Sequence, residues 1–273
     1  MTKPILSILI TSYKNASLLK LCIKSFQKNL KDLKYEIIVS DSETTEEIKD
    51  LMREKFPKIK FLSNEKNVGF GVLVNQLLKV ARGEFYFLVN ADIIIKDDVT
   101  QKLLKYLKED PEIGIIGPKL INFDNSVQPS FFKFYRVTTV IYRRTFLKKM
   151  GFAKKELERF LMKNVKKNQP FEVDWLMGSA LMFRATTAKK IGPMDRRFFM
   201  YFEDVDWCWR SWENGLKVIH NPLVRVYHYH GKQSANKGIL KAIFFNKYAR
   251  IHIQSAIKFF WKHRTLGWKL PYY

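Results

Sequence analysis

Residues 85–95 read FYFLVNADIII, an apolar run that Asn90 and Asp92 interrupt with only Ala91 between them. The run is typical of a buried strand. Burying oxygen-rich side chains without partners costs roughly 2–7 kcal/mol each, so these two groups need something to bind. The stretch predicts a strand that ends at a functional site. The alternative is that Asn90-Ala91-Asp92 simply forms a turn leaving the strand.

The segments before this stretch alternate between strand and helix. Strands are expected at residues 5–13, 35–41, 58–64 and 84–90, and helices at 15–30, 44–56 and 71–81. Asn15 or Ser17 could cap the first helix, and Thr44 could open the second. Such alternation is typical of a parallel sheet that helices cover on both faces. The sequence therefore predicts an α/β fold with a mostly parallel central sheet.

Polar residues gather at or just beyond the carboxyl ends of all four expected strands. They are Thr11, Ser12, Tyr13, Asp41, Asn67, Gly69, Asn90 and Asp92. In open sheets of this kind, ligands bind at the carboxyl edge, where the strand order reverses. Chance could place polar groups at one or two ends, but four ends favour a binding site.

The pattern is less regular after residue 97. A helix is expected at 97–110, a strand at 113–121, a basic aromatic insert at 122–170, a buried element at 173–184 and a helix-bearing segment at 196–215. No repeat or clear boundary precedes residue 235. We therefore expect one domain over residues 1–235, followed by a basic aromatic tail over residues 236–273.

Three acids stand in an aromatic setting in FMYFEDVDWCWR, residues 199–210. An apolar environment raises the pKa of a carboxyl group, which suits a general base such as Glu203 or Asp204. The alternative is a set of acids at a helix N-terminus. We expect Asp206 to be of this second kind, paired with Arg210 one turn later.

A pair of histidines follows in VYHYHGKQS, residues 226–234. His228 and His230 would point to the same side of an extended segment and could bind a metal or a phosphate. Lys232 and Ser234 could add phosphate contacts. A single histidine is more often structural, but this pair is less easily explained that way.

The chain is strongly basic, with 49 Lys and Arg against 26 Asp and Glu and a formal net charge of +23. Such a charge attracts nucleic acid, an anionic membrane or a phosphorylated substrate. Its two cysteines, Cys22 and Cys208, predict no disulfide framework and favour a cytoplasmic location. The start, MTKPILSILITSY, lacks the features of a signal peptide, and no apolar stretch is long enough to predict a membrane-spanning helix.

The order of these motifs resembles glycosyltransferase family 2, with the GT-A fold, in its bacterial rhamnosyltransferase-like branch. The motifs are SILITSYKN, IIVSDSET, NEKNVGFGVLVNQLLKVARGEFYFLVNADI, VDWLMGSALMFR, FFMYFEDVDWCWR and HYHGKQS. The resemblance covers about residues 5–235. It implies that residues 1–97 bind a nucleotide-sugar and residues 98–235 an acceptor. The implied reaction is an inverting, metal-dependent sugar transfer.

The resemblance also implies roles for single residues. It assigns nucleotide and donor contacts to Thr11, Ser12, Tyr13, Asp41, Asn67, Gly69, Phe70, Asn75, Asn90 and Ala91. Asp92, with His228 as an additional ligand, would hold Mg²⁺ or Mn²⁺ on the diphosphate. Asn90 stands where the commoner form of this motif has an aspartate.

On the acceptor side, the resemblance makes Asp204 the base, with Glu203 beside it. Trp175, Gly178 and Ser179 would shape the sugar and acceptor pocket, although Trp175 could equally belong to the core. Arg184 is expected to be structural.

The resemblance implies a dTDP- or UDP-sugar donor, with dTDP-rhamnose by analogy. The acceptor would be a glycan or a polyprenyl-diphosphate-linked sugar in cell-surface polysaccharide synthesis. The basic insert, the tail and the net charge together suit peripheral contact with the anionic inner face of the plasma membrane. The alternative for the tail is a helix that packs back onto the domain.

Three other functions compete with glycosyl transfer. A nucleic-acid-binding protein would be similarly basic, but the sequence carries no recognition motif, so nucleic acid is not expected as a partner. A sugar-phosphate nucleotidyltransferase should open with a Gly-rich, Arg-containing loop, which SILITSYKNAS lacks. A catalytically inactive relative is disfavoured because Asp92 and Asp204 are both present.

Overall fold

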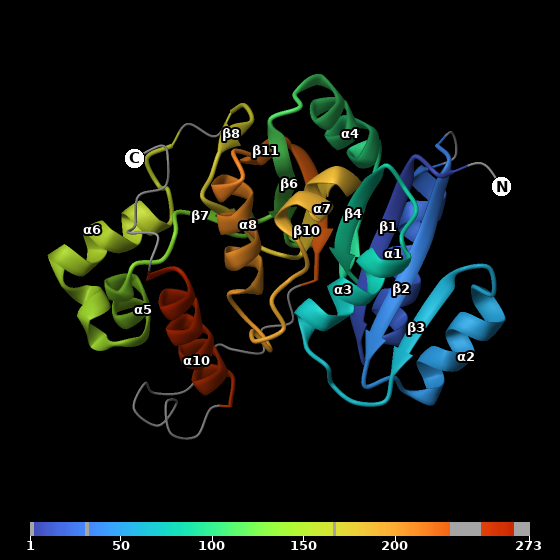
Figure 1. Ribbon diagram of the computed structural model, residues 1–273, viewed down its shortest axis with the longest axis horizontal. Coiled ribbons are helices and arrows are strands. Elements are labelled where there is room, and N and C mark those ends of the chain that lie inside the picture. Colours follow the sequence, from blue (N-terminus) through green and yellow to red (C-terminus); the bar gives the residue numbers. More distant parts are fainter. Residues whose placement is uncertain (1–2, 31–32, 166–167, 230–246, 265–273) are drawn as a thin grey trace.

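The computed structural model describes residues 3–30, 33–165, 168–229 and 247–264 (Figure 1). Its strands are β1 Leu6–Tyr13, β2 Tyr35–Ser42, β3 Lys60–Asn64, β4 Phe85–Asn90, β5 Ile93–Ile94, β6 Ile113–Ile121, β7 Phe131–Phe132, β8 Phe171–Glu172, β9 Trp175–Leu176, β10 Ala180–Arg184 and β11 Lys217–His228. Its helices are α1 Ala16–Asn29, α2 Glu46–Lys55, α3 Phe70–Val80, α4 Val99–Glu109, α5 Val137–Arg144, the 3₁₀ helix η1 Phe146–Lys149, α6 Gly151–Phe160, α7 Ala185–Ile191, α8 Glu203–Glu213 and α10 Lys247–Lys262.

Within these described residues, nine strands form one sheet in the order β3-β2-β1-β4-β10-β6-β11-β5, with β8 paired to β11 outside this order. The β3-β2-β1-β4 half is parallel throughout. β10 runs antiparallel between β4 and β6, whereas β11 is parallel to β6. The predicted α/β fold with a mostly parallel central sheet is therefore confirmed.

Side chains of the sheet alternate between two hydrophobic cores, because successive residues of a strand point to opposite faces. In β1, Leu6, Ile8 and Ile10 join the core formed with α1, α2 and α4. Leu9 joins the opposite core, to which α3, α7, α8 and α10 contribute. Burial on both faces explains why the central strands are apolar runs rather than alternating patterns.

Each core contains one cysteine. Cys22 lies on α1 in the first core and Cys208 on α8 in the second, and both side chains are completely buried. Both are free thiols, which agrees with the expected absence of a disulfide framework.

Helix starts follow the predicted cap chemistry with one correction. The Asn15 side chain accepts a hydrogen bond from the Leu18 N–H at the start of α1. In α2 the cap is Thr45, whose hydroxyl oxygen accepts from the Ile48 N–H, so the prediction of Thr44 was wrong by one residue. The Thr44 hydroxyl instead lies 3.2 Å from the Asn64 backbone nitrogen, whose N–H donates to it, and so links β3 to the start of α2.

The basic insert forms α5, η1 and α6, which lie with α10 at the end of the molecule opposite α2 and β3 (Figure 1). Of the predicted tail, residues 236–246 and 265–273 lie outside the described part. Residues 247–264 contain α10, which packs against the domain through Ala256 and Phe259. None of the helices that the structure describes is both long and apolar enough to span a bilayer.

Candidate active site

The strand register brings the polar strand ends together. Thr11 of β1 lies opposite Asn90 of β4, and Ser12 lies opposite Asp41 of β2. The Thr11 hydroxyl donates to the Asn90 side-chain oxygen at 3.0 Å, and the Ala91 N–H donates to the Thr11 carbonyl at 2.8 Å. These residues form the floor of the candidate site.

Asp41 is buried at this floor. Neither of its carboxylate oxygens, nor the adjacent Ser12 hydroxyl, has a hydrogen-bond partner within the described part of the chain. Burial raises the pKa of Asp41, and the nearby hydroxyl groups of Ser12 and Thr44 offset only part of this shift. An unsatisfied buried carboxyl group suits a ligand that brings its own N–H donor.

The loop after β3 is built around Asn67 and Gly69. The Asn67 side-chain oxygen accepts from the Gly69 N–H at 3.1 Å, and the Val68 N–H donates to the Ser42 hydroxyl at 3.0 Å. Gly69 has a φ of +81°, and a Cβ atom there would lie 2.5 Å from the Phe199 carbonyl oxygen. Glycine is thus required both for its backbone conformation and for the close approach of the 193–202 loop.

Asp92 and His228 meet although they are far apart in sequence. Asp92 Oδ2 lies 3.4 Å from His228 Nε2, because the end of β11 pairs with β5. His228 Nδ1 lies 2.7 Å from Gln128 Oε1, so the Gln128 oxygen favours the tautomer that carries its proton on Nδ1. In that tautomer Nε2 carries no proton, and it faces the Asp92 carboxylate.

This pair fits a divalent cation. Asp92 Oδ1 is buried and has no hydrogen-bond partner among the described residues, as expected of a ligand atom. A carboxylate oxygen and a neutral imidazole nitrogen suit Mn²⁺, and the carboxylate oxygen suits Mg²⁺. Residues 3–30, 33–165, 168–229 and 247–264 contain no group of three or more His, Cys, Asp and Glu arranged to hold a metal. A cation at Asp92 would need further oxygens, such as those of a diphosphate.

Asp204 lies in the first turn of α8, with both carboxylate oxygens held by backbone donors. The Gly178 N–H donates to Oδ2 at 3.0 Å and the Val205 N–H donates to Oδ1 at 2.9 Å. Burial raises the pKa of Asp204 to about 6, and these hydrogen bonds offset part of the shift. Burial, together with the Asp204 charge, raises the pKa of Glu203 well above its usual range.

The backbone before this pair is strained. Tyr201 and Phe202 both have a φ of +68°, which is uncommon for residues other than glycine. Aromatic packing holds the turn in place, because the Phe202 ring lies 4.7 Å from Tyr135 and 5.4 Å from Phe259, between ring centroids. Such strain persists only where the surroundings determine the conformation, and it is common at functional sites.

Gly178 and Ser179 join the two halves of the site. The Ser179 carbonyl accepts from the Asn90 N–H at 3.0 Å, while Gly178 donates to Asp204. A Cβ atom on Gly178 would lie 3.1 Å from the Phe70 ring and 3.4 Å from Asp204 Cβ. The strand end at Asn90 and the carboxylate of Asp204 are therefore linked through two consecutive residues.

The structure places two of the candidate residues away from this cluster. Both polar atoms of the Asn75 side chain bond the Met194 backbone at 2.8 Å, so Asn75 fastens α3 to the 193–202 loop. Trp175 is buried in the second core, where its ring stacks on Phe132 at 4.6 Å and its Nε1–H donates to the Lys133 carbonyl.

Other candidates lie at the rim or outside the described residues. Tyr13 is half exposed, and its hydroxyl donates to Glu43 at 3.1 Å. Arg184 is structural, as expected, because it donates to the Ile113 and Asp110 carbonyl groups. His230, Lys232 and Ser234 fall in the segment that the structure does not describe.

Asp206 is part of a buried ion cluster. Its predicted pairing with Arg210 is present, at 3.0 Å between Asp206 Oδ2 and Arg210 Nε. Sequence reasoning missed two further partners at the end of α10 and just after it: Lys262 Nζ lies 2.6 Å and His263 Nε2 lies 2.9 Å from Asp206 Oδ1. Burial alone would raise the pKa of Asp206, but His263, Arg210 and Lys262 lower it overall.

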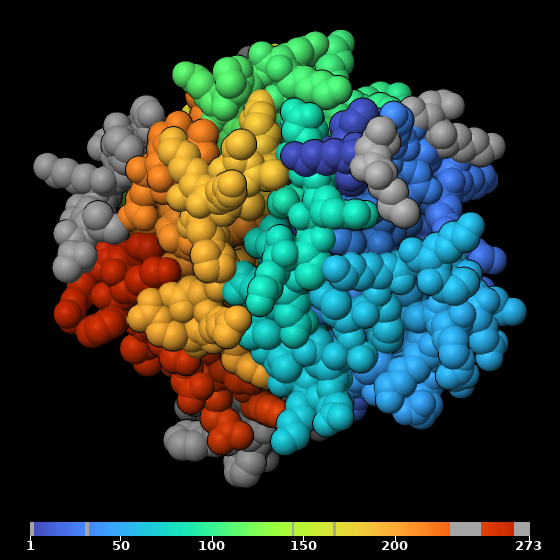
Figure 2. Space-filling model, turned by 45° about the vertical axis from the view of Figure 1, so that its right-hand side comes forward, coloured from blue at the N-terminus to red at the C-terminus, as the bar shows by residue number. Residues whose placement is uncertain are grey.

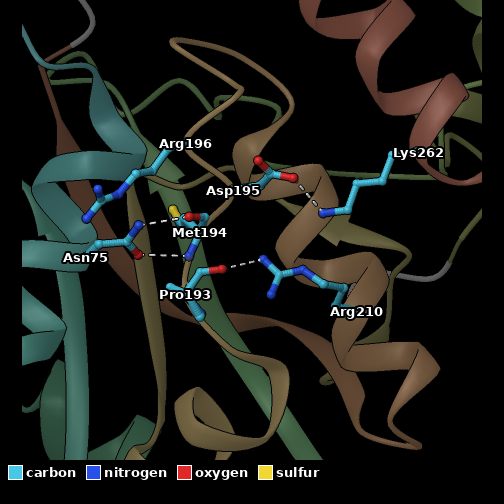
Figure 3. A pocket seen from close by; sticks show the side chains of 7 residues that line it. All are labelled: Asn75, Pro193, Met194, Asp195, Arg196, Arg210 and Lys262. Carbon is cyan, nitrogen blue, oxygen red and sulfur yellow. Dashed lines mark hydrogen bonds and ion pairs between the residues drawn. The ribbon is translucent and has the colours of Figure 1, made fainter.

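A cavity of about 550 Å³ lies beside this cluster, between α3, the 193–202 loop and α10 (Figure 3). Asn75, Asp195, Arg210 and Lys262 line it, and Figure 3 shows Lys262 reaching from α10 to Asp195. On the face drawn in Figure 2, α7 and the loop after it (gold) lie between α3 (teal) and α10 (red).

Gln128, which orients His228, was also not predicted from the sequence, because no local pattern signals a contact across 100 residues.

Comparison with protein families adds an independent observation. The model of glycosyl transferase family 2 matches residues 7–191, more than half of the chain. The matched segment includes Asp41, Asn90 and Asp92 and ends before Glu203.

Two curated relatives are rhamnosyltransferases. The chain is 27% identical over 213 residues to N-acetylglucosaminyl-diphospho-decaprenol L-rhamnosyltransferase of Mycobacterium tuberculosis, with 71% of this chain and 66% of that protein covered. It therefore spans just under two thirds of the mycobacterial protein. It is 25% identical over 273 residues to rhamnosyltransferase WbbL of Escherichia coli (strain K12), with 95% and 94% covered.

The fold also matches solved structures. The crystal structure of GalNAc-T7 with UDP, GalNAc and Mn²⁺ superposes with a TM-score of 0.62 at 17% identity, covering 90% of this chain and 49% of that one. A likeness at this identity shows the fold alone, and it confirms the predicted GT-A architecture. From the family match, its extent and the two relatives, the chain belongs to glycosyltransferase family 2, in a rhamnosyltransferase-like branch.

Proposed function

We propose that the chain is an inverting, metal-dependent glycosyltransferase that moves a sugar from a nucleotide-diphosphate donor to a hydroxyl group of the acceptor. The observation that carries the proposal is the geometry of Asp204. Its carboxylate is fixed by two backbone N–H groups, its pKa is raised to about 6, and it is linked through Gly178 and Ser179 to Asn90.

Asp204 is the general base of this reaction. It accepts the proton of the acceptor hydroxyl while the hydroxyl oxygen forms a bond to the anomeric carbon of the donor sugar. The bond between that carbon and the diphosphate oxygen breaks, and the nucleoside diphosphate leaves with the electron pair. A single displacement inverts the anomeric centre. A pKa near 6 leaves Asp204 ionised at neutral pH and more basic than an ordinary aspartate.

Donor binding is assigned to the floor of the site. Asp41 would accept a hydrogen bond from an N–H of the base, and the loop around Asn67, Gly69 and Phe70 would line the nucleotide. Asp92 and His228 would hold Mg²⁺ or Mn²⁺, and the cation would stabilise the charge of the departing diphosphate. Support for a cation comes from the unsatisfied Asp92 Oδ1 and from the Mn²⁺ in the similar GalNAc-T7 structure.

The donor sugar and the acceptor are proposed from the relatives. Both relatives are named as rhamnosyltransferases, so dTDP-rhamnose is the first donor to test. The mycobacterial name specifies an N-acetylglucosaminyl-diphospho-decaprenol acceptor, which supports a polyprenyl-diphosphate-linked sugar here. Such an acceptor would place the chain at the inner face of the plasma membrane, in cell-surface polysaccharide synthesis.

The test is donor binding and slow donor hydrolysis across dTDP-rhamnose, UDP-sugars and GDP-sugars, each with and without Mn²⁺ or Mg²⁺. One donor should bind in a metal-dependent way. Asp204→Asn should keep that binding and lower turnover by a factor of about 10²–10⁴. Asp92→Asn should weaken metal-dependent binding instead.

Asp98→Asn serves as the control, because it makes the same change at an exposed position just before α4. It should behave like the unmodified chain. Binding of none of the donors, or full turnover in Asp204→Asn, would contradict the proposed function.

A further inference from the structure

The insert presents an exposed apolar and basic surface at the junction of α5, η1 and α6. We call it the hairpin patch and define it by Phe146, Lys148, Lys149, Met150, Phe152 and Lys154. Phe146 is 74% exposed, Phe152 is 54% exposed and Met150 is 46% exposed. Single exposed apolar side chains are ordinary, but three large ones within seven consecutive residues suggest a partner.

The patch is continuous with its neighbours. The rings of Phe152 and Tyr142 lie 5.5 Å apart between centroids, so α6 and α5 contribute to the same surface. Residues 141–155, IYRRTFLKKMGFAKK, contain six Lys and Arg and no Asp or Glu. The charged residues of this segment are therefore all basic.

The buried carboxylate of Glu156 links α5 to α6, the two helices that flank the hairpin patch. Glu156 of α6 accepts hydrogen bonds from the Thr139 hydroxyl of α5 and from Arg159, at 2.7 Å to its Nη2. Arg136, at the start of α5, lies 3.3 Å from the same carboxylate. Together with the contact of Tyr142 and Phe152, these bonds fix α5 against α6.

The segment that leads into α5 also contacts the residue before Glu203 and Asp204. Tyr135, two residues before α5, lies 4.7 Å from the Phe202 ring, and Phe202 immediately precedes Glu203 and Asp204. The patch therefore lies in the same half of the molecule as Asp204, at the end opposite α2 (Figure 1).

We propose that the hairpin patch docks the chain on the surface of an anionic phospholipid bilayer. Aromatic and Met side chains that enter the interface, ringed by lysines that meet anionic headgroups, are the chemistry of peripheral membrane binding. A second copy of this chain is a poor occupant, because docking patch on patch would place lysines against lysines. The inference rests on the proposed function in one respect: a lipid-linked acceptor makes the bilayer the expected partner.

The experiment uses the full chain and two kinds of vesicle, phosphatidylcholine alone and phosphatidylcholine with phosphatidylglycerol, in a sedimentation assay. The unmodified chain should sediment with the anionic vesicles, and added salt should weaken this binding. Phe146→Ser with Phe152→Ser should lower the partition coefficient about tenfold or more. Lys148→Gln with Lys149→Gln should lower it to a similar degree.

Matched controls are available elsewhere on the surface. Leu223→Ser removes an apolar side chain that is 56% exposed on β11, and Lys105→Gln with Lys108→Gln removes the same charge from α4. Both should bind vesicles like the unmodified chain. Thermal unfolding of every variant verifies that it is folded, because the substituted side chains are exposed.

Donor hydrolysis without vesicles separates this inference from the proposed function. The patch variants should hydrolyse the donor at the unmodified rate. Vesicle binding that is absent, or that the patch variants retain in full, overturns the docking surface even if hydrolysis is intact. Retention of duplex DNA that depends on the patch, without vesicle binding, also overturns it. Patch-dependent vesicle binding without hydrolysis supports the docking surface and contradicts only the proposed function.

Discussion

At the scale of single residues, the candidate site is defined by carboxyl groups whose surroundings differ. Among the described residues, Asp206 is buried with three basic partners that lower its pKa, whereas Asp204 has only backbone donors and a pKa raised to about 6. Asp41 and Asp92 each bury oxygen atoms that lack a partner among the described residues. The environments of these carboxyl groups thus differ, and this difference is the basis of the separate roles that we propose for them.

The raised pKa of Asp204 predicts a pH dependence of turnover. Only the ionised carboxylate can accept a proton, so kcat should increase with pH through about pH 6 and reach a plateau above pH 7. At pH 5 about a tenth of the maximal rate is expected. Initial rates at saturating donor and acceptor between pH 5 and pH 8 test this, with donor affinity over the same range as the control. A flat profile would contradict the role of Asp204.

Gly69 predicts a local stability effect. Gly69→Ala places a Cβ atom 2.5 Å from the Phe199 carbonyl oxygen at a positive φ, so the free energy of unfolding should fall by about 1–3 kcal/mol. The donor KM should increase, because the Asn67 loop is displaced. Gly151→Ala is the control, since outside its chain neighbours and the backbone of its own helix no atom lies within 4 Å of its added Cβ. Urea unfolding and donor kinetics of both variants provide the measurement; equal effects in the two would refute the close-packing argument.

The roles of Asn75 and Trp175 show where residue-level reasoning from sequence ends. Both belong to motifs of the right family and in the right order, yet their polar atoms bond the backbone of Met194 and Lys133. A motif gives the position of a residue along the chain but not the direction of its side chain. Asn90 and Asp92 were easier to interpret, because polar groups that end a buried strand need a partner.

At the scale of elements, β1 to β4 and α1 to α3 were predictable because each has its own hydrophobic pattern, whereas the short strand β5 was not predicted. The antiparallel strand β10 was not, since its place between β4 and β6 depends on pairings with segments 60 to 100 residues away. The contact of Lys262 of α10 with Asp206 could not be predicted from the sequence either. Of the two alternatives for the tail, the described residues 247–264 pack on the domain, whereas contact of the remaining tail with a membrane stays a prediction.

The helix α10 supports the loop that leads to Asp204. Ser255 Oγ donates to the Met200 carbonyl at 2.9 Å, Lys258 Nζ donates to the Arg197 carbonyl at 2.8 Å, and Lys262 Nζ lies 3.0 Å from Asp195 Oδ2. These three side chains are spaced on one face of the helix and meet successive parts of one loop. The loop also lies against Gly69, so α10 supports both the loop around Asn67 and Gly69 and the segment that leads to Asp204.

Lys262→Met tests this bracing role. The change removes the bonds to Asp195 and Asp206, so the free energy of unfolding should fall by about 1–3 kcal/mol. The kcat should fall by a larger factor than the donor KM rises, because the loop before Asp204 loses its support. Lys189→Met, an exposed change of the same kind on α7, is the control. Lower stability with unchanged kcat would limit α10 to a structural role.

At the scale of the whole molecule, the segment that matches the family is not a complete sheet. β11, which follows it, pairs with β6, β5 and β8 and supplies His228, while α8 supplies Trp207 to the second core. A chain that ends at Ile191 would expose the edge of β6 and one face of that core.

We therefore expect residues 1–191 alone not to fold cooperatively. Thermal unfolding followed by near-ultraviolet circular dichroism should show no transition for this segment, whereas residues 1–264 should show one. A cooperative transition of the shorter segment would mean that the first half is an independent folding unit.

The placement of one buried thiol in each core gives the protein two internal chemical probes. Burial raises the pKa of both thiols, and neither side chain is accessible, so alkylating reagents should react only after local opening. The rate of Cys22 modification would then report how fast the core under α1 opens. The rate of Cys208 modification would report the same for the core under α8. Mass spectrometry of the two peptides can follow both rates in one sample, and a bound donor should slow them to different extents if the halves open separately.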